Sequence, residues 1–100
     1  MLSGKVKLKG IPFMSVYANL HEPQRIECDF EGYPPVITTW KKKSGIQIED
    51  NQRITQSNNV LTFTGVEKED AGTYWCTGKN EFSSFTSYVN ITVFGKIIEM

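Results

Sequence analysis

Two cysteines and the single histidine, Cys28, Cys76 and His21, are the side chains of this 100-residue chain that are best suited to chemistry. Thiols ligate zinc, act as nucleophiles when a base activates them, or oxidise to a disulfide. So few residues leave little material for a metal site or a histidine-based catalytic site. The sequence also shows no nucleophile with a base and no phosphate-binding loop, so we expect no enzyme and no cofactor.

The composition is that of one ordinary globular domain, with 39% hydrophobic and 22% charged residues. Eleven Lys and Arg balance eleven Asp and Glu, which argues against a nucleic-acid partner because such binding needs a basic surface. No apolar run approaches the roughly 18 residues of a membrane span, so we expect no direct membrane insertion. The first residues lack the apolar run of a signal peptide, so a secreted parent would make this chain an excised fragment.

Short windows of alternating apolar and polar residues must position these side chains, because no helical pattern extends over ten residues. In the window 24–31, for example, Ile26, Cys28 and Phe30 share one face and three carboxylates the other. About eight such windows follow at intervals near ten residues; the expected strands are 5–9, 13–18, 24–31, 36–43, 53–56, 60–64, 73–79 and 85–94. The pattern predicts an all-β sandwich of two antiparallel sheets.

Four residues then combine into a recognisable constellation. Cys28 and Cys76 are 48 residues apart and point inward on different strands, Trp40 points inward between them, and Tyr74 comes two residues before the second cysteine. This combination resembles the immunoglobulin fold, with its pin of two cysteines and a tryptophan and its tyrosine corner. The resemblance covers residues 5–94 and implies Greek-key connections, with residues 1–4 and 95–100 as flanking or linker residues.

Finer features are similar to the intermediate, or I-type, set of this family. The Gly- and Pro-rich segment 32–42 resembles the entry of that set into its third strand. Asn80 to Ser83 resembles its N-x-x-G turn, with Ser83 in place of the glycine, and Pro12 matches the break in its split first strand. Members of this kind occur in neural and other cell-adhesion molecules, receptor tyrosine kinase ectodomains and titin-type muscle proteins.

The resemblance implies structural roles for six residues. Cys28 and Cys76 would form a disulfide between the sheets; the alternatives are two reduced buried thiols, as in cytosolic muscle relatives, or a metal or catalytic role for which only His21 offers a partner. Trp40 and Tyr74 would be core residues. Arg53 and Asp70 match positions that form a salt bridge, the alternative being two solvated loop charges.

Two polar motifs suggest attachment or binding at the surface. Asn90-Ile91-Thr92 is an N-glycosylation sequon, and alternation places Asn90 outward, although the motif also arises by chance. Lys41-Lys42-Lys43 suggests heparin or phosphate binding, and the alternative is a solvated strand end.

Exposed aromatic residues are the candidate protein-binding surface. Trp75 and Phe94 face outward by alternation, Ile37 does so on a neighbouring strand, and Phe82 and Phe85 flank the last hairpin. Clustered exposed aromatics mark interfaces; the alternative is that the stems of Lys41 and Lys79 cover them. The opposite sheet is expected to be acidic through Glu27, Asp29 and Glu31, and less suited to an interface core.

These features together favour a non-catalytic recognition or spacer module of a cell-adhesion molecule or receptor ectodomain. Its partner would be a protein, homophilic or heterophilic, besides the neighbouring domains of the parent chain, and its location extracellular or on the cell surface. The alternative is an intracellular I-type domain of a muscle or cytoskeletal scaffold.

Overall fold

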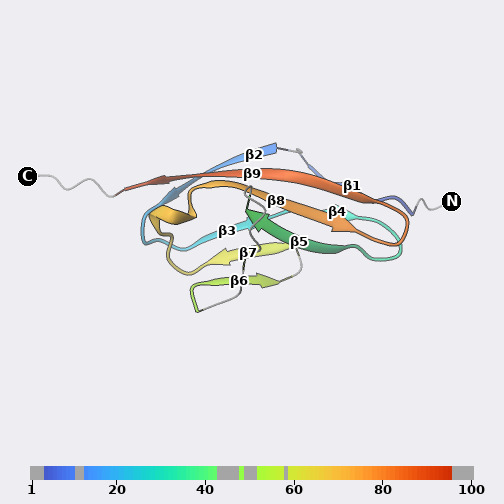
Figure 1. The fold of residues 1–100 in the computed structure, drawn as a ribbon, viewed down its shortest axis with the longest axis horizontal. Coiled ribbons are helices and arrows are strands. Elements are labelled where there is room, and N and C mark those ends of the chain that lie inside the picture. Colours follow the sequence, from blue (N-terminus) through green and yellow to red (C-terminus); the bar gives the residue numbers. More distant parts are fainter. Residues whose placement is uncertain (1–3, 11–12, 43–47, 49–51, 58, 96–100) are drawn as a thin grey trace, which may run out of the picture.

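The computed structural model describes residues 4–10, 13–42, 48, 52–57 and 59–95. Their regular structure consists of nine strands and one 3-10 turn, η1. The bounds are β1 Lys7–Leu8, β2 Phe13–Asn19, β3 Gln24–Glu27, β4 Phe30–Glu31, β5 Ile37–Lys42, β6 Ile54–Ser57, β7 Val60–Phe63, η1 Lys68–Asp70, β8 Gly72–Lys79 and β9 Ser84–Phe94. The all-β architecture expected from the alternation is confirmed (Figure 1).

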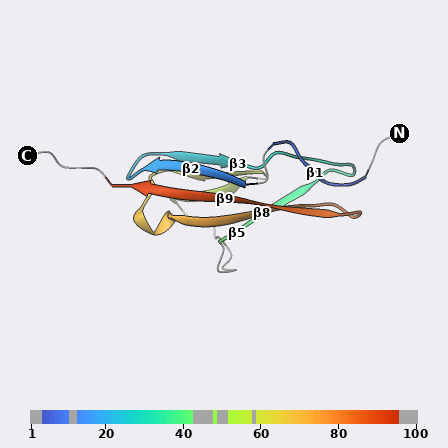
Figure 2. The same ribbon diagram turned by 90° about the horizontal axis from the view of Figure 1, so that it is seen from above.

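Two layers of strands enclose the core. One layer is a four-stranded sheet in the order β2-β9-β8-β5, and the other holds β3-β7-β6. Seen from above, β3 lies on one side of the molecule and β8 and β5 lie on the other (Figure 2). The strands within each layer are antiparallel except that β2 runs parallel to β9. This is the sandwich that the sequence predicts.

The N-terminal part of the chain is divided between the layers. β1 pairs with β4, whereas β2 joins the edge of the four-stranded sheet beside β9. The expected single strand 24–31 is itself split into β3 and β4. The reason is a change of partner: Cys28 N–H donates to Asn59 O, and one residue later Asp29 O accepts from Lys9 N–H.

The core lies between the layers and follows the period of two. Along β9, Val89 and Ile91 are at most 2% exposed, while Tyr88 and Phe94 are 41% and 50% exposed. Successive side chains of a strand point to opposite faces, so one face of the four-stranded sheet fills the core and the other meets solvent. The buried hydrophobic cluster comprises Ala18, Ile26, Cys28, Trp40, Leu61, Phe63, Val66, Tyr74, Cys76, Val89 and Ile91.

The turn between β8 and β9 is organised by the side chain of Asn80. Its Oδ1 accepts from the backbone N–H groups of Phe82 and Ser83, and its Nδ2 donates to Gly4 O and Pro34 O. Ser83 Oγ in turn accepts from Val6 N–H at 2.7 Å. Serine at the position expected for glycine therefore ties the entering chain to this hairpin. The described chain enters at this end and leaves from the opposite end of β9 (Figure 1).

Candidate functional site: the outer face of the four-stranded sheet

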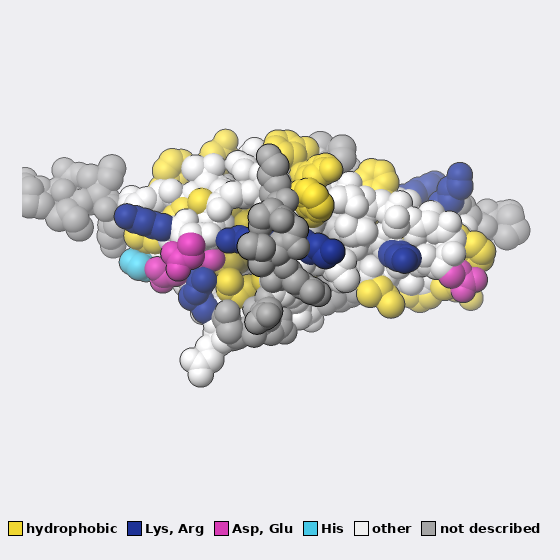
Figure 3. All heavy atoms as spheres, in the orientation of Figure 1, with side chains coloured by type: hydrophobic (Ala, Val, Ile, Leu, Met, Phe, Trp, Pro, Cys, Tyr) yellow, Lys and Arg dark blue, Asp and Glu magenta, His cyan; other side chains and the backbone are white. Residues whose placement is uncertain are grey.

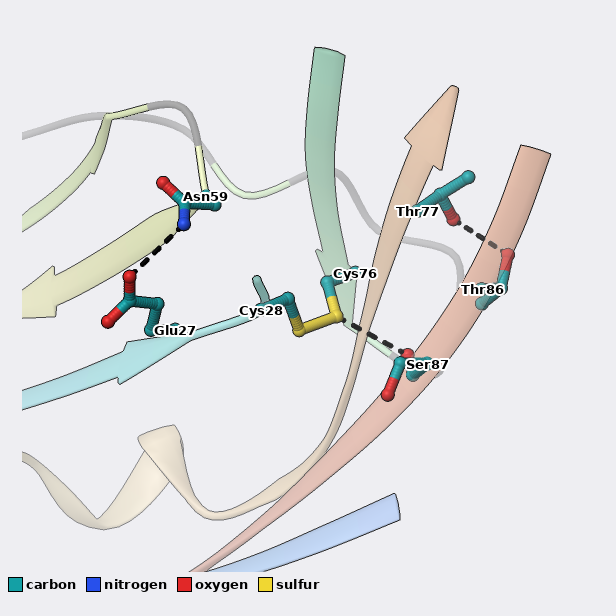
Figure 4. Close-up of a disulfide and its surroundings, with 7 residues drawn as sticks. All are labelled: Glu27, Cys28, Asn59, Cys76, Thr77, Thr86 and Ser87. Carbon is teal, nitrogen blue, oxygen red and sulfur yellow. Dashed lines mark hydrogen bonds between the residues drawn. A yellow bond between two sulfur atoms is a disulfide. The ribbon is translucent and has the colours of Figure 1, made fainter. Parts of the chain in front are cut away.

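The two cysteines form a disulfide at the centre of the sandwich. Cys28 and Cys76 are bonded, their Cα atoms are 6.5 Å apart, and both residues are at most 2% exposed. The bond crosses from the end of β3 to β8 (Figure 4), and Trp40 lies opposite Cys76 in the β5–β8 register. Both sulfurs are thereby consumed by the cross-link, which removes them as nucleophiles or metal ligands.

A second buried cluster closes one end of the sandwich. Two guanidinium nitrogens of Arg53 donate to the two carboxylate oxygens of Asp70, at 2.5 and 3.1 Å. The same carboxylate accepts from Glu67 N–H, and Tyr74 donates its hydroxyl to Asp70 O at 2.6 Å. Burial raises the pKa of the Tyr74 hydroxyl above its ordinary value, with a smaller contribution from the Asp70 charge. The hydroxyl therefore stays protonated and keeps donating at neutral pH, as a structural element.

The lysine run does not form one cluster. Lys41 points to the outer face, whereas Lys42 points the other way: its Nζ lies 5.7 Å from the centroid of the Tyr74 ring and donates to Glu69 O. Lys43 lies outside the described residues. Alternation along β5 thus separates the first two charges, which disfavours the heparin or phosphate hypothesis.

Aromatic side chains gather on the solvent side of the four-stranded sheet. Phe13, Tyr88 and Trp75 lie side by side across β2, β9 and β8, since Phe13 pairs with Tyr88 and Tyr88 with Trp75. The Trp75 and Tyr88 rings meet edge to face, with centroids 6.0 Å apart. Further along, Tyr17 stacks on Phe94 at 5.9 Å. We call this surface, made of Phe13, Tyr17, Trp75, Tyr88 and Phe94, the aromatic face.

The aromatic face differs from the set expected from sequence. Trp75 and Phe94 belong to it, but Ile37 is at the start of β5, opposite Lys79, and Phe82 is in the hairpin turn. Phe85 packs on the inner side, where its ring lies 6.5 Å from that of Phe30. The five predicted residues therefore do not form one cluster.

Sequence reasoning missed three members of the face. Tyr88 shares the parity of Asn90 and so carried a usable signal. Phe13 and Tyr17 carried a signal as well, because they share their parity with the polar residues Ser15 and Asn19. The wholly apolar set of Met14, Val16 and Ala18 marks the buried face of this strand.

The absence of a side chain at Gly78 explains how Phe30 packs against β8 beside Phe85. Gly78 lies opposite Phe85 in the β8–β9 register. A Cβ at Gly78 would stand 2.6 Å from the Phe30 ring, so only glycine lets Phe30 pack there.

Charge also distinguishes the two faces. In the described strands, the outward side of the four-stranded sheet carries Lys41 and Lys79 and no carboxylate. Figure 3 views this side: hydrophobic side chains gather along its upper part, and carboxylates lie toward the ends. Glu27, Asp29 and Glu31, which were expected to make the opposite sheet acidic, are all exposed, and Lys9 lies 3.7 Å from Asp29.

Asn90 lies within the aromatic face. It is partly exposed on β9, between Ser15 of β2 and Thr73 of β8, and its Oδ1 accepts a hydrogen bond from Thr73 Oγ1 at 3.1 Å. The outward direction expected for this sequon asparagine is the one observed.

Two of the hollows among the described residues are shallow. One, of about 290 Å³, is lined by Asn19, Leu20, His21, Glu22, Phe94 and Gly95, and the other, of about 190 Å³, lies near Cys28. Within the same residues no group of three His, Cys, Asp or Glu side chains is placed to hold a metal ion. Among them no helix is long and apolar enough to cross a membrane.

Comparison with known proteins agrees with this architecture. Residues 8–80 match the family described as Immunoglobulin domain. Human Contactin-4 is 39% identical over 69 residues, which are 68% of this chain and 7% of that protein. Neural cell adhesion molecule 1-B of Xenopus laevis is 32% identical over 82 residues, which are 79% of this chain and 7% of that protein. The chain thus spans less than a tenth of either relative.

A solved structure of a chimeric titin Z1Z2 superposes with a TM-score of 0.78 at 20% identity, covering 93% of this chain and 98% of that one. At that identity the likeness concerns the fold. The family match, the disulfide between the sheets and the tyrosine corner all agree. This chain therefore belongs to the immunoglobulin domain family.

Proposed function

We propose that this domain is a non-catalytic recognition or spacer module of the I-type, in the extracellular part of a cell-adhesion molecule or receptor. The observation that carries the proposal is the buried Cys28–Cys76 disulfide. Disulfides persist in oxidising compartments and are rare in the cytosol. The adhesion molecule among the relatives supports the same assignment.

The placement of the chain ends supports a role as a link between neighbouring domains. The chain enters beside the β8–β9 turn and leaves at the far end of β9 (Figure 1). A domain with its ends on opposite sides can continue a row of domains without turning the chain back. We take residues 5–94 as the domain and the residues on either side as its connections.

Thiol titration of the denatured protein, taken from its native compartment without added reductant and with oxygen excluded, tests this location. We expect no free thiol, because both sulfurs are bonded in the folded state. Two free thiols would instead favour the intracellular scaffold of the titin type, because the cytosol keeps such thiols reduced.

Protein recognition would use the aromatic face. Aromatic residues are enriched at interface cores and carboxylates are depleted there. Phe13, Tyr17, Tyr88 and Phe94 are 41 to 66% exposed, so large apolar rings meet solvent on a surface where the described strands carry no acidic group. The partner would then be a protein. A second copy of this chain is the partner that can be tested directly.

Trp75→Ala is expected to weaken association by more than about 1 kcal/mol, because central aromatic residues dominate interface energies. Sedimentation of the chain over a range of concentrations measures self-association. Asp29→Lys, on the other layer, is the matched control and should leave association unchanged.

The folding stability of both variants completes this test. Trp75→Ala should cost up to about 1.5 kcal/mol of unfolding free energy through its edge-to-face contact with Tyr88, in addition to the loss of its partly buried surface. A loss of association confined to Asp29→Lys would show that the other layer is the binding face. A wild-type chain that stays monomeric would exclude a second copy as the partner.

A further inference from the structure

The sequon asparagine occupies the middle of a sheet rather than an edge or a loop. β9 lies between β2 and β8, and Asn90 has Ser15 on one side and Thr73 on the other. The bond from Thr73 Oγ1 holds the amide oxygen of Asn90. The amide nitrogen is the atom that carries an N-linked sugar, and no hydrogen bond from it to another described residue is found. The side chain is thus held with its attachment atom available.

Aromatic residues flank Asn90 along the strands in both directions. Tyr88 precedes it by two residues and lies on the same face, with Trp75 against its ring. On the other side, Thr92 pairs with Tyr17, which stacks on Phe94. Two residues along a strand span about 7 Å, so a sugar on Asn90 stands between these two clusters.

The residues beside Asn90 across the sheet are small. Ser15 and Thr73 form a low strip between the taller aromatic side chains. A bulky, hydrophilic glycan leaving Asn90 therefore has space at its base and aromatic rings on both sides. The apolar faces of sugar rings pack on aromatic rings, which removes apolar surface from water.

We propose that an N-linked glycan on Asn90 covers the aromatic face, and that occupancy of this site decides whether the face is open to a protein partner. The effect on a partner rests on the proposed function of that face, whereas the covering itself does not. The glycosylated domain keeps Trp75 and Tyr88 shielded. The unmodified domain presents them to solvent.

Acrylamide quenching of tryptophan fluorescence measures this covering without any partner. Trp40 is 1% exposed and contributes little, so the quenchable signal reports on Trp75. The chain is expressed through a secretory pathway, and the glycan is identified by the mass lost on glycosidase treatment. We expect the quenching constant to rise when the glycan is removed.

Two substitutions of Thr92 supply matched controls. Thr92→Ser keeps the sequon and should retain the glycan and the low quenching constant. Thr92→Val keeps a β-branched residue but destroys the sequon, so it should give the high constant without enzyme treatment. Trp75→Phe should abolish the response to glycan removal, because the remaining tryptophan is buried.

The quenching and association measurements test two separate statements: that the glycan covers the aromatic face, and that this face binds a protein. A secreted chain without glycan, or an equal quenching constant with and without it, would overturn the covering. If the covering is found but Trp75→Ala leaves association unchanged, the glycan shields the face and the face is not the binding site. If both hold, Thr92→Val should associate more tightly than Thr92→Ser.

Discussion

Replacing Cys28 and Cys76 together by alanine is expected to lower the free energy of unfolding by about 4 kcal/mol. The disulfide joins residues 48 positions apart, and a link of that span restricts the unfolded chain far more than the folded one. A domain of this size has a total stability of about 5 to 15 kcal/mol. The loss is thus a large part of the total.

Urea unfolding measures this loss, followed by the fluorescence of the two tryptophans. The reduced wild-type chain is the control, since it lacks the bond but keeps both cysteines, and it should unfold near the midpoint of the double variant. Addition of reductant should leave the double variant unchanged. A double variant within about 1 kcal/mol of the oxidised wild type would show that the link contributes little.

Asp70→Asn is expected to cost about 3 kcal/mol, the second large effect, because it breaks a buried ion pair from one side. The Asp70 side chain is 3% exposed and accepts bonds from two Arg53 nitrogens and from Glu67 N–H. Asparagine keeps the shape but turns one acceptor into a donor that faces the guanidinium. The Asp70 carboxylate is the more deeply buried member of the pair, because the Arg53 side chain is 30% exposed and still contacts solvent.

The surface pair of Lys9 and Asp29 provides the comparison. Its two side chains are about half exposed and their charged atoms are 3.7 Å apart. Asp29→Asn removes the same charge, yet it should cost less than about 1 kcal/mol because solvent screens the pair. Urea unfolding of both variants gives the two values. Equal small losses would contradict a structural role for the buried pair.

Local alternation was sufficient to predict the core. Cys28 and Trp40 lie between polar residues, and Tyr74 and Cys76 each have a polar residue on one side, so their inward direction follows from the period of two. The split of the strand expected at 24–31 was not predictable in the same way. It depends on which segment of the chain supplies the hydrogen-bond partner before and after Cys28: residue 59 pairs with Cys28, and residue 9 pairs with Asp29.

For the aromatic face, the direction of several side chains could be predicted from the sequence, but their neighbours across the sheet could not. The outward direction of Trp75, Phe94 and Asn90 is a property of each strand alone. Their neighbours depend on sheet order and register: Tyr88 lies beside Trp75 because β8 pairs with β9, and Phe13 lies beside Tyr88 because β2 runs parallel to β9. Residues 13 and 88 are far apart in the chain, and nothing local relates them.

The sequence by itself determined the fold family, the core residues around the disulfide and the outward direction of the sequon asparagine. These follow from residue type and spacing along single strands. Only the tertiary structure decided that Phe85 lies beside Phe30, opposite the glycine at 78, and that Asn90 stands between two aromatic clusters. Such contacts arise from pairing between distant strands, which sets each side chain's neighbours and has no counterpart in the local pattern.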